Sequence, residues 1–307
     1  MVKTYESAAL FLKEAKEILL EQEAVSQLVL GNAIGAGDQP CRSDLFFGTV
    51  WLKGEMVMAF CNCLPWNLVI HAVLQRKGEV WRNEADALIG AESEKIATAA
   101  RELAAYLKEN AIPVKGVNAN GFVCQNFLEH YCEEGLIAEK ELSMDIMECR
   151  NLRPAALQAG IYRSAAPEDA DWILEGCLAF EQEALGKQGD REKLLENILD
   201  HQIKNNSLRL FCLTDNTPVC MANLARNLTN GFSINQVYTV PKYRGKGYAQ
   251  TLIYKFCEEF FRSGYSFATL FVDKTNPISN RVYAKVGFEI VEDNYAYHFT
   301  EAEEKDE

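Results

Sequence analysis

The order of predicted helices and strands restricts the fold of this chain more than any single motif does. An amphipathic helix over residues 4–30 comes first, and three apolar strands follow between residues 45 and 74. Two further helices, over 93–110 and 122–135, lead to a strand at 144–152. Because helices and strands mix within one stretch, the pattern predicts a mixed α/β (α+β) unit with helices packed on a sheet.

Residues 153–160 mark a change in composition, and the same order of elements begins again after them. The segment RPAALQAG is small and rich in breakers, which is typical of a linker. Two helices follow, then antiparallel strands joined by turns at Asp215–Pro218 and Asn230–Gly231, and then helix, strand, helix and strand. A chain of 307 residues has room for about two domains. We therefore predict two copies of one unit, with domains at 1–152 and 153–307.

The charge and cysteine content narrow the classes of function. The formal net charge is -13, which argues against nucleic-acid binding because phosphate backbones require a basic face. The ten cysteines form no C-x-x-C pair and the four histidines are scattered, so we expect no metal site and a reduced, cytoplasmic setting. No stretch reaches the roughly 18 apolar residues of a membrane span, and the acidic N-terminal segment is unlike a targeting signal.

One short segment concentrates positive charge in this acidic chain. The sequence VPKYRGKGYAQTLIYKF, residues 240–256, places Lys242, Arg244 and Lys246 among two glycines, after a strand and before an apolar helix. Glycine exposes its N–H group and tolerates positive φ, and a helix start has unsatisfied N–H donors and a partial positive charge. Together these groups predict a cradle for an anion, with a phosphate or pyrophosphate as the natural ligand.

A second motif lies downstream, and one predicted helix sets its spacing. It reads N-x-x-S-x-x-x-Y-x-x-x-G-F from Asn276 to Phe288. Asn276 is a typical N-cap, Pro277 suits the first helical position, and Gly287 is typical of a helix end. The serine and tyrosine of the motif therefore lie one turn apart on the same helix face.

With both motifs in this order, residues 153–299 resemble the GNAT superfamily of acyl-CoA-dependent N-acyltransferases. The arrangement with a preceding, weaker half resembles the two-domain predicted acetyltransferases of bacteria. The resemblance implies a central, mostly antiparallel sheet flanked by helices, in two tandem GNAT-like units. Residues 1–152 would then be a degenerate GNAT-like domain, and residues 153–307 the catalytic acetyltransferase domain.

The resemblance also implies a site that uses acetyl-CoA as cosubstrate. The glycine loop would hold the pyrophosphate, the end of the preceding strand would pair with the pantetheine arm, and the acceptor would be a primary amine of a small molecule or peptide. Tyr283 would act as general acid toward the leaving thiolate. The implied cofactor-binding residues are Thr239, Val240, Arg244, Gly245, Lys246, Gly247, Tyr248, Ala249, Asn276 and Ser279.

Two departures from the family pattern bear on the chemistry. The central strand often carries a glutamate as base, but here it reads SINQVYT, with Asn235 and Gln236 and no acid. Glu181 and Glu183 on an earlier helix are the remaining candidates, and the base stays unassigned. In the first half, Val80 occupies the final small position of the corresponding loop, so we predict that the N-terminal domain binds no coenzyme A.

Other classes of function stay open at this stage. A degenerate acyltransferase that senses acyl-CoA, or serves as an interaction module, would keep the cradle and lack the base. A nucleotide-binding protein could use the same cradle for ATP, but nothing in the sequence resembles a magnesium site. The amine acceptor and the oligomeric state, including a homodimer, are also open.

Overall fold

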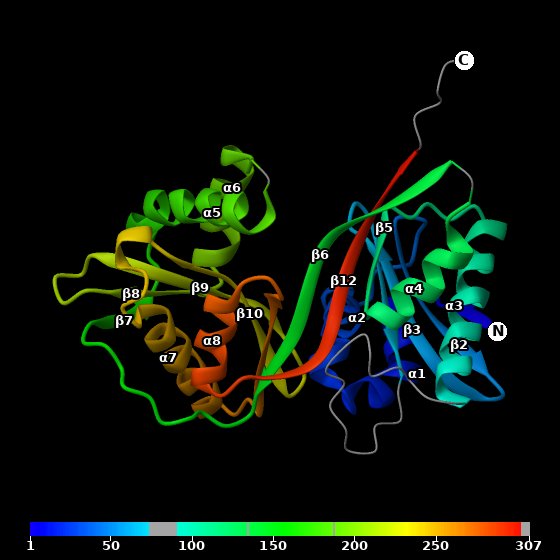
Figure 1. Ribbon diagram of the computed structural model, residues 1–307, viewed down its shortest axis with the longest axis horizontal. Coiled ribbons are helices and arrows are strands. Elements are labelled where there is room, and N and C mark those ends of the chain that lie inside the picture. Colours follow the sequence, from blue (N-terminus) through cyan, green and yellow to red (C-terminus); the bar gives the residue numbers. More distant parts are fainter. Residues whose placement is uncertain (74–90, 134, 187, 302–307) are drawn as a thin grey trace, which may run out of the picture. The chain divides into compact units, whose positions relative to one another are not determined.

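The computed structural model of the chain describes residues 1–73, 91–133, 135–186 and 188–301 (Figure 1). The chain divides into two compact units. Unit 1 comprises the described residues up to Met147, together with Val272–Thr275 and the described residues from Ile290 onward. Unit 2 comprises Glu148–Phe271 and Asn276–Glu289.

The strands of unit 1 form a mostly antiparallel sheet in the order β1-β2-β3-β4-β5-β12-β6. The pair β4 and β5 is parallel. The three strands predicted between residues 45 and 74 are confirmed as β2, β3 and β4. The bounds are β1 (Val2–Thr4), β2 (Leu45–Leu52), β3 (Glu55–Cys63), β4 (Leu68–Ala72), β5 (Gly116–Ala119), β6 (Leu136–Cys149) and β12 (Glu289–Glu301).

Helices cover both faces of the unit 1 sheet. On one face α1 (Ala8–Leu20) and α2 (Glu23–Ala36) enclose a core that includes Phe11 and Phe47. On the other, α3 (Ala91–Glu109) and α4 (Gly121–Tyr131) enclose a second core. The single helix predicted over residues 4–30 is wrong, because a helix of that length would extend about 40 Å, well beyond a strand of eight residues. The chain instead turns and packs two shorter helices on the same face.

Unit 2 repeats this pattern of strands. Its order is β11-β10-β9-β8-β7, with β10 and β11 parallel and the other pairs antiparallel. The predicted turn at residues 215–218 is stabilised by the Asp215 carboxylate, which accepts from the Thr217 N–H at 3.0 Å. The bounds are β7 (Ile161–Ser164), β8 (Leu208–Cys212), β9 (Pro218–Asn227), β10 (Gly231–Thr239) and β11 (Phe267–Asp273).

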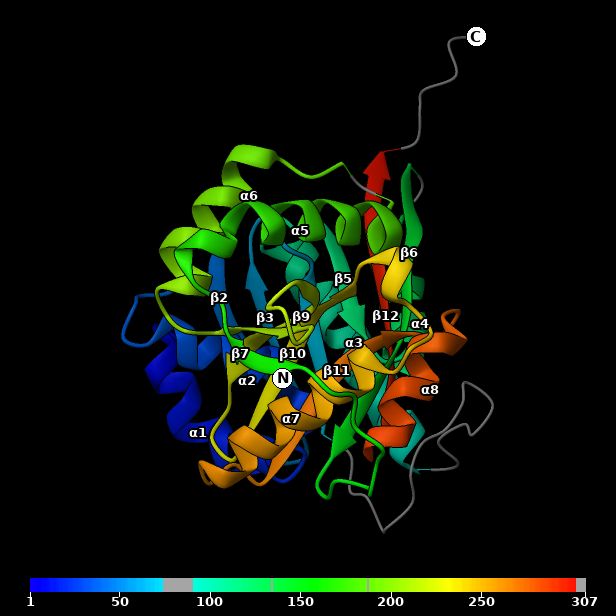
Figure 2. The same ribbon diagram turned by 90° about the vertical axis from the view of Figure 1, so that its left-hand side faces the viewer.

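The helices of unit 2 also lie on two faces of its strands (Figure 2). A 3-10 turn η1 (Pro167–Asp169), α5 (Ala170–Leu185), α6 (Arg191–Asn197) and a π-helical turn η2 (Ile198–Ile203) cover one face, over an apolar core that includes Leu210 and Met221. On the opposite face lie α7 (Tyr248–Arg262) and α8 (Pro277–Val286). Glu259 of α7 accepts from the Arg209 guanidinium of β8 at 2.7 and 3.0 Å, which fixes α7 against the sheet.

The end of the chain departs from the predicted domain limits. β12 follows α8 in sequence, but Tyr295 of β12 pairs with Ala119 of β5, so the strand belongs to unit 1 from Ile290 onward. The amino-acid composition can indicate a linker. The pairing of two strands that are distant in sequence leaves no signal in the local sequence. The boundary after residue 152 itself stays a prediction.

Candidate active site

The glycine loop joins β10 to α7 in the way the sequence predicts. After Thr239 the chain makes a 3-10 turn, η3 (Pro241–Tyr243), and α7 then begins at Tyr248. Gly245 and Gly247 have φ values of +75° and +84°. Residues with a side chain rarely adopt such backbone, so the two glycines allow the loop to turn directly into the helix.

The loop presents a row of free backbone donors. Within the described part of the chain, the N–H groups of residues 245–250 have no hydrogen-bond acceptor, and the first intrahelical bond is donated by Thr251 to the Gly247 carbonyl. No side chain caps the helix start at Gly247. These donors lie at the positive end of the α7 dipole, which is the arrangement that binds phosphate groups.

Two lysines add charge to this row of donors. Lys242 and Lys246 place their ammonium groups 4.9 and 5.5 Å from the centre of the Tyr243 ring. Both residues are exposed, and no carboxylate among the described residues lies within ion-pair distance of either. The cations are therefore available to an anionic ligand.

A bulge separates β10 from its parallel neighbour beside the loop. Pairing of β10 with β11 runs from Gly231 only to Ile234, although β10 continues to Thr239. The pairing of β10 with β9 shifts register between Asn235 and Tyr238, as in a β-bulge. Beyond the bulge the Val240 N–H donates to β9, so by alternation the Thr239 N–H points away from β9. The β10 edge is thus open to an added extended segment.

Tyr283 lies on the α7 and α8 face of the sheet. Asn276 caps α8 by accepting from the Ser279 N–H at 3.2 Å, and Gly287 ends the helix with a φ of +126°, as the motif predicts. The Tyr283 ring packs on Phe288, with centroids 5.8 Å apart, and its hydroxyl has no hydrogen-bond partner in the described structure. Burial raises the pKa of Tyr283 well above its ordinary value, so the phenol keeps its proton at neutral pH.

Comparison with known proteins agrees with this geometry. Residues 174–288 match the sequence profile of the acetyltransferase (GNAT) family. Those residues are a GNAT acetyltransferase domain. Family and fold together support acyl transfer from coenzyme A as the class of reaction. No curated protein sequence matches the chain.

Solved structures share the fold over most of this chain. A GNAT-family acetyltransferase from Colwellia psychrerythraea covers 98% of this chain and 100% of its own, with 13% identity and a TM-score of 0.52. A GCN5-related N-acetyltransferase from Sphaerobacter thermophilus covers 91% of each chain, with 15% identity and a TM-score of 0.53. A Drosophila protein covers 97% of this chain and 98% of its own, with 13% identity and a TM-score of 0.59. At these identities the likeness shows the fold alone.

The structure gives the predicted loop residues of the GNAT domain different roles. The Arg244 guanidinium donates to both Glu183 oxygens, at 2.7 and 2.9 Å, and to the Thr239 carbonyl at 2.9 Å. Its side chain therefore joins the loop to α5. The Val240 N–H donates to Val219, so that residue offers no free donor to a ligand. Tyr248 packs its ring near Phe211, at 5.8 Å, and contributes its backbone N–H to the row of donors.

Two contacts that shape the loop of the GNAT domain have no counterpart in the predictions from sequence. The backbone N–H of Gln158, in the segment predicted to be a linker, donates to the Thr251 hydroxyl at 2.9 Å. A Cβ atom on Gly247 would lie 3.2 Å from the Gln158 amide nitrogen, so the linker packs against the loop. The second contact is the ion pair of Glu183 with Arg244. Neither contact has a local signal, because each joins segments that are distant in sequence.

Unit 1 lacks the tyrosine of the GNAT domain at the corresponding helix position. Asn120 caps α4 by accepting from the Val123 N–H at 2.9 Å, much as Asn276 caps α8. Seven residues after Asn120 the chain carries Phe127, which is fully buried, whereas seven residues after Asn276 it carries Tyr283. The loop containing Val80, where we predict no coenzyme A binding, lies outside the described residues.

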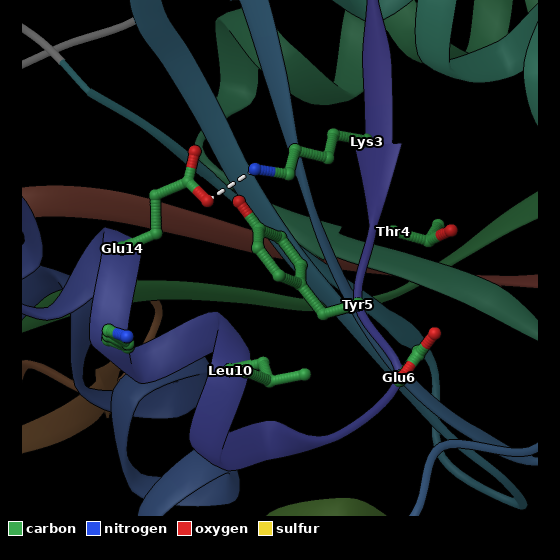
Figure 3. A pocket seen from close by; sticks show the side chains of 7 residues that line it. Lys3, Thr4, Tyr5, Glu6, Leu10 and Glu14 are labelled. Atoms are coloured by element: carbon green, nitrogen blue, oxygen red, sulfur yellow. Dashed lines mark hydrogen bonds and ion pairs between the residues drawn. The ribbon is translucent and has the colours of Figure 1, made fainter.

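A hollow in the surface of unit 1 contains none of the predicted site residues. It lies between β1 and the start of α1, where the Lys3 ammonium pairs with the Glu14 carboxylate and lies 5.0 Å from the centre of the Tyr5 ring (Figure 3). In the described parts of both units, no group of three or more His, Cys, Asp or Glu side chains is placed to hold a metal ion. None of the described helices is long and apolar enough to cross a bilayer.

Proposed function

We propose that the protein is an N-acyltransferase that moves an acetyl group from acetyl-CoA to a primary amine by direct attack. The observation that carries this proposal is the row of free N–H groups at residues 245–250. They lie at a helix start, beside two lysines that have no carboxylate partner in the described part of the chain, and the net charge of the whole chain is -13. A pyrophosphate would satisfy these donors and neutralise the cations.

The open edge of β10 suits the rest of the cosubstrate. An extended arm that carries amide groups could pair with the free Thr239 N–H as an added strand would. The exposed end of α8, with Asn276 and Ser279, would flank that arm, and Ala249 would leave room beside the loop. Acetyl-CoA, when bound, supplies the acetyl group as an activated thioester.

The departing sulfur needs a proton, and Tyr283 is the residue that we propose as its donor. Its hydroxyl is a free donor with the proton held at neutral pH. The same burial makes the phenol a weaker acid, because a raised pKa means that the proton is released less readily. We therefore assign Tyr283 a supporting contribution, toward the lower end of the range usual for general acids.

The attacking amine must be neutral, and the two candidate bases differ in their ion pairing. The Glu183 carboxylate is paired with Arg244. Glu181 has no cationic partner among the described residues, so its carboxylate is free to take a proton, directly or through water, and we favour it as the base. Asn235 and Gln236 on β10 cannot act as bases at neutral pH.

Calorimetry with coenzyme A, combined with a thiol-release assay on a panel of amines, tests the proposal. The wild type should bind coenzyme A and release thiol from acetyl-CoA with at least one amine. Gly247→Glu should abolish binding, because it places a carboxylate among the donors. Gly247→Gln is the matched control for bulk and backbone strain and should retain partial affinity.

Two other outcomes of these experiments would argue against the proposal. Binding without turnover over a broad panel would favour an acyl-CoA sensor, which the absence of an acid on β10 would suit. Equal affinity in wild type and Gly247→Glu would place the ligand elsewhere and overturn the proposed cradle.

A further inference from the structure

Gln236 has an unusual backbone conformation for the interior of a strand. Its φ is +49°, in the left-handed region that side chains other than glycine and asparagine rarely adopt. It lies in the β10 bulge, two residues after Ile234, the last residue that pairs with β11. Such strain persists only where the surroundings hold it in place, and it is concentrated at functional sites.

A buried amide holds the Gln236 side chain in this position. The Gln202 amide nitrogen donates to the Gln236 side-chain oxygen at 2.5 Å. The Gln236 amide nitrogen in turn lies 3.8 Å from the Cys177 sulfur of α5. Burial raises the pKa of Cys177 to about 12, so this sulfur stays an uncharged thiol. The bulge is thus tied to α5 and η2, the elements on the face opposite α7.

Gln202 lies in a rare type of secondary structure and is deeply buried. It lies in the π-helical turn η2, and π-helical turns are rare and often occur at functional sites. The residue is only 6% exposed, and its side-chain amide oxygen has no partner among the described residues. A buried acceptor without a partner lowers stability, and the hydrogen bond that Gln202 donates to Gln236 offsets this cost.

We infer that Gln202 and Gln236 are positioning residues that hold the β10 bulge and so keep β10 apart from β11 for the cosubstrate. The inference rests on the proposed function, since it concerns the same acyl-CoA site. Without the Gln202 amide, β10 beyond Asn235 would sample a regular strand conformation. The open edge at Thr239 would then be only partly formed before ligand binding, and affinity would fall with the population of the competent form.

Two variants separate this positioning role from a structural one. Gln202→Met removes the amide and the unpartnered oxygen but keeps the volume. The lost hydrogen bond to Gln236 offsets the gain from removing that oxygen, so thermal stability should change little. Gln236→Gly keeps the positive φ accessible and removes the tie to Gln202. Both should weaken coenzyme A binding about fivefold to tenfold and speed hydrogen exchange at the Val240 amide, and the double variant should be no worse than either single one.

Lys53→Gly is the matched control for backbone strain. Lys53 has a φ of +52° in the exposed turn between β2 and β3, so its replacement relieves the same strain in unit 1. It should leave coenzyme A affinity unchanged. Wild-type affinity and wild-type exchange at Val240 in both glutamine variants would overturn the inference. If the wild type binds no coenzyme A, the proposed function fails, while exchange at Val240 in the ligand-free protein still decides whether the amide pair holds the bulge.

Discussion

At the scale of single residues, Tyr283 offers the sharpest test of the chemistry. Tyr283→Phe removes only the hydroxyl and leaves the packing on Phe288 in place. Turnover should fall roughly 10- to 100-fold, as expected for a general acid of limited strength, while coenzyme A affinity stays within about twofold. Steady-state kinetics and calorimetry measure the two quantities. Tyr265→Phe also removes one hydroxyl, which donates to Asn227, and should leave turnover intact. Unchanged turnover in Tyr283→Phe would exclude this hydroxyl as proton donor.

The residues that were predictable from sequence are those whose role is local. Asn276 and Gly287 bound a helix through contacts with its own backbone, so their types and spacing indicate both ends of α8. Gly245 and Gly247 are likewise predictable, because the positive φ values of the loop itself require glycine at these positions. The positive φ of Gln236 has no such signal, because a distant amide on η2 enforces it.

At the scale of elements, the pair of Glu183 and Arg244 connects α5 to the glycine loop. The two side chains are about half exposed, so their attraction contributes little to stability. Glu183→Gln frees donors of the guanidinium and removes a negative charge close to the expected phosphates. We predict that coenzyme A affinity rises about two- to fivefold, as measured by calorimetry at low salt, and that the gain shrinks as salt is added. Weaker binding would instead mean that Arg244 acts by fastening the loop to α5.

A second ion pair fixes the connection between β7 and α5. Asp169 accepts from Arg163 at 2.6 and 2.8 Å and from the Ala166 N–H at 2.8 Å. The hydrogen bonds from Arg163 lower the pKa of Asp169 below its ordinary value. Its stabilising effect is therefore complete above the unfolded pKa of about 4 and is lost as pH falls through the lower folded pKa.

Asp169→Asn should lower the free energy of unfolding by about 2 kcal/mol at pH 7, the usual worth of hydrogen bonds to charged groups. Urea unfolding from pH 7 down to pH 3 measures the effect. The difference from wild type should narrow below about pH 4, where Asp169 of the unfolded chain takes up a proton, and it should vanish only below the lower pKa of the folded state. Asp215→Asn, in an exposed turn, is the control and should cost less. A difference that does not vary with pH would assign the effect to packing.

At the scale of the whole molecule, the repeated order of elements was visible in the sequence because amphipathic periods are local. The position of β12 in the sheet could not be predicted from the sequence. Its sequence shows that it is a strand, but nothing in it shows that Tyr295 pairs with Ala119. The same limit applies to catalysis: Phe127 could be compared with Tyr283 only once Asn120 and Asn276 were seen to cap corresponding helices.

The place of β12 makes residues 1–152 an incomplete unit. β12 lies between β5 and β6, and its Phe299 ring stacks on Tyr131 at 5.3 Å within the core under α3 and α4. A fragment of residues 1–152 would expose the edges of both neighbouring strands and lose that part of the core. Exposed edges promote aggregation, so we predict that the fragment is poorly soluble and binds hydrophobic dyes.

A synthetic peptide of residues 289–301 should restore the fragment by occupying the same position. Circular dichroism, dye binding and urea unfolding with and without peptide measure the recovery, which should saturate at one peptide per fragment. A peptide with Tyr295→Asp and Tyr297→Asp keeps the length but places charge against α4, and it should fail. A fragment that unfolds cooperatively without peptide, at the same urea concentration as unit 1 in the intact chain, would show that β12 is dispensable. Recovery with the wild-type peptide alone would show that the last strand of the chain completes the sheet of its first unit.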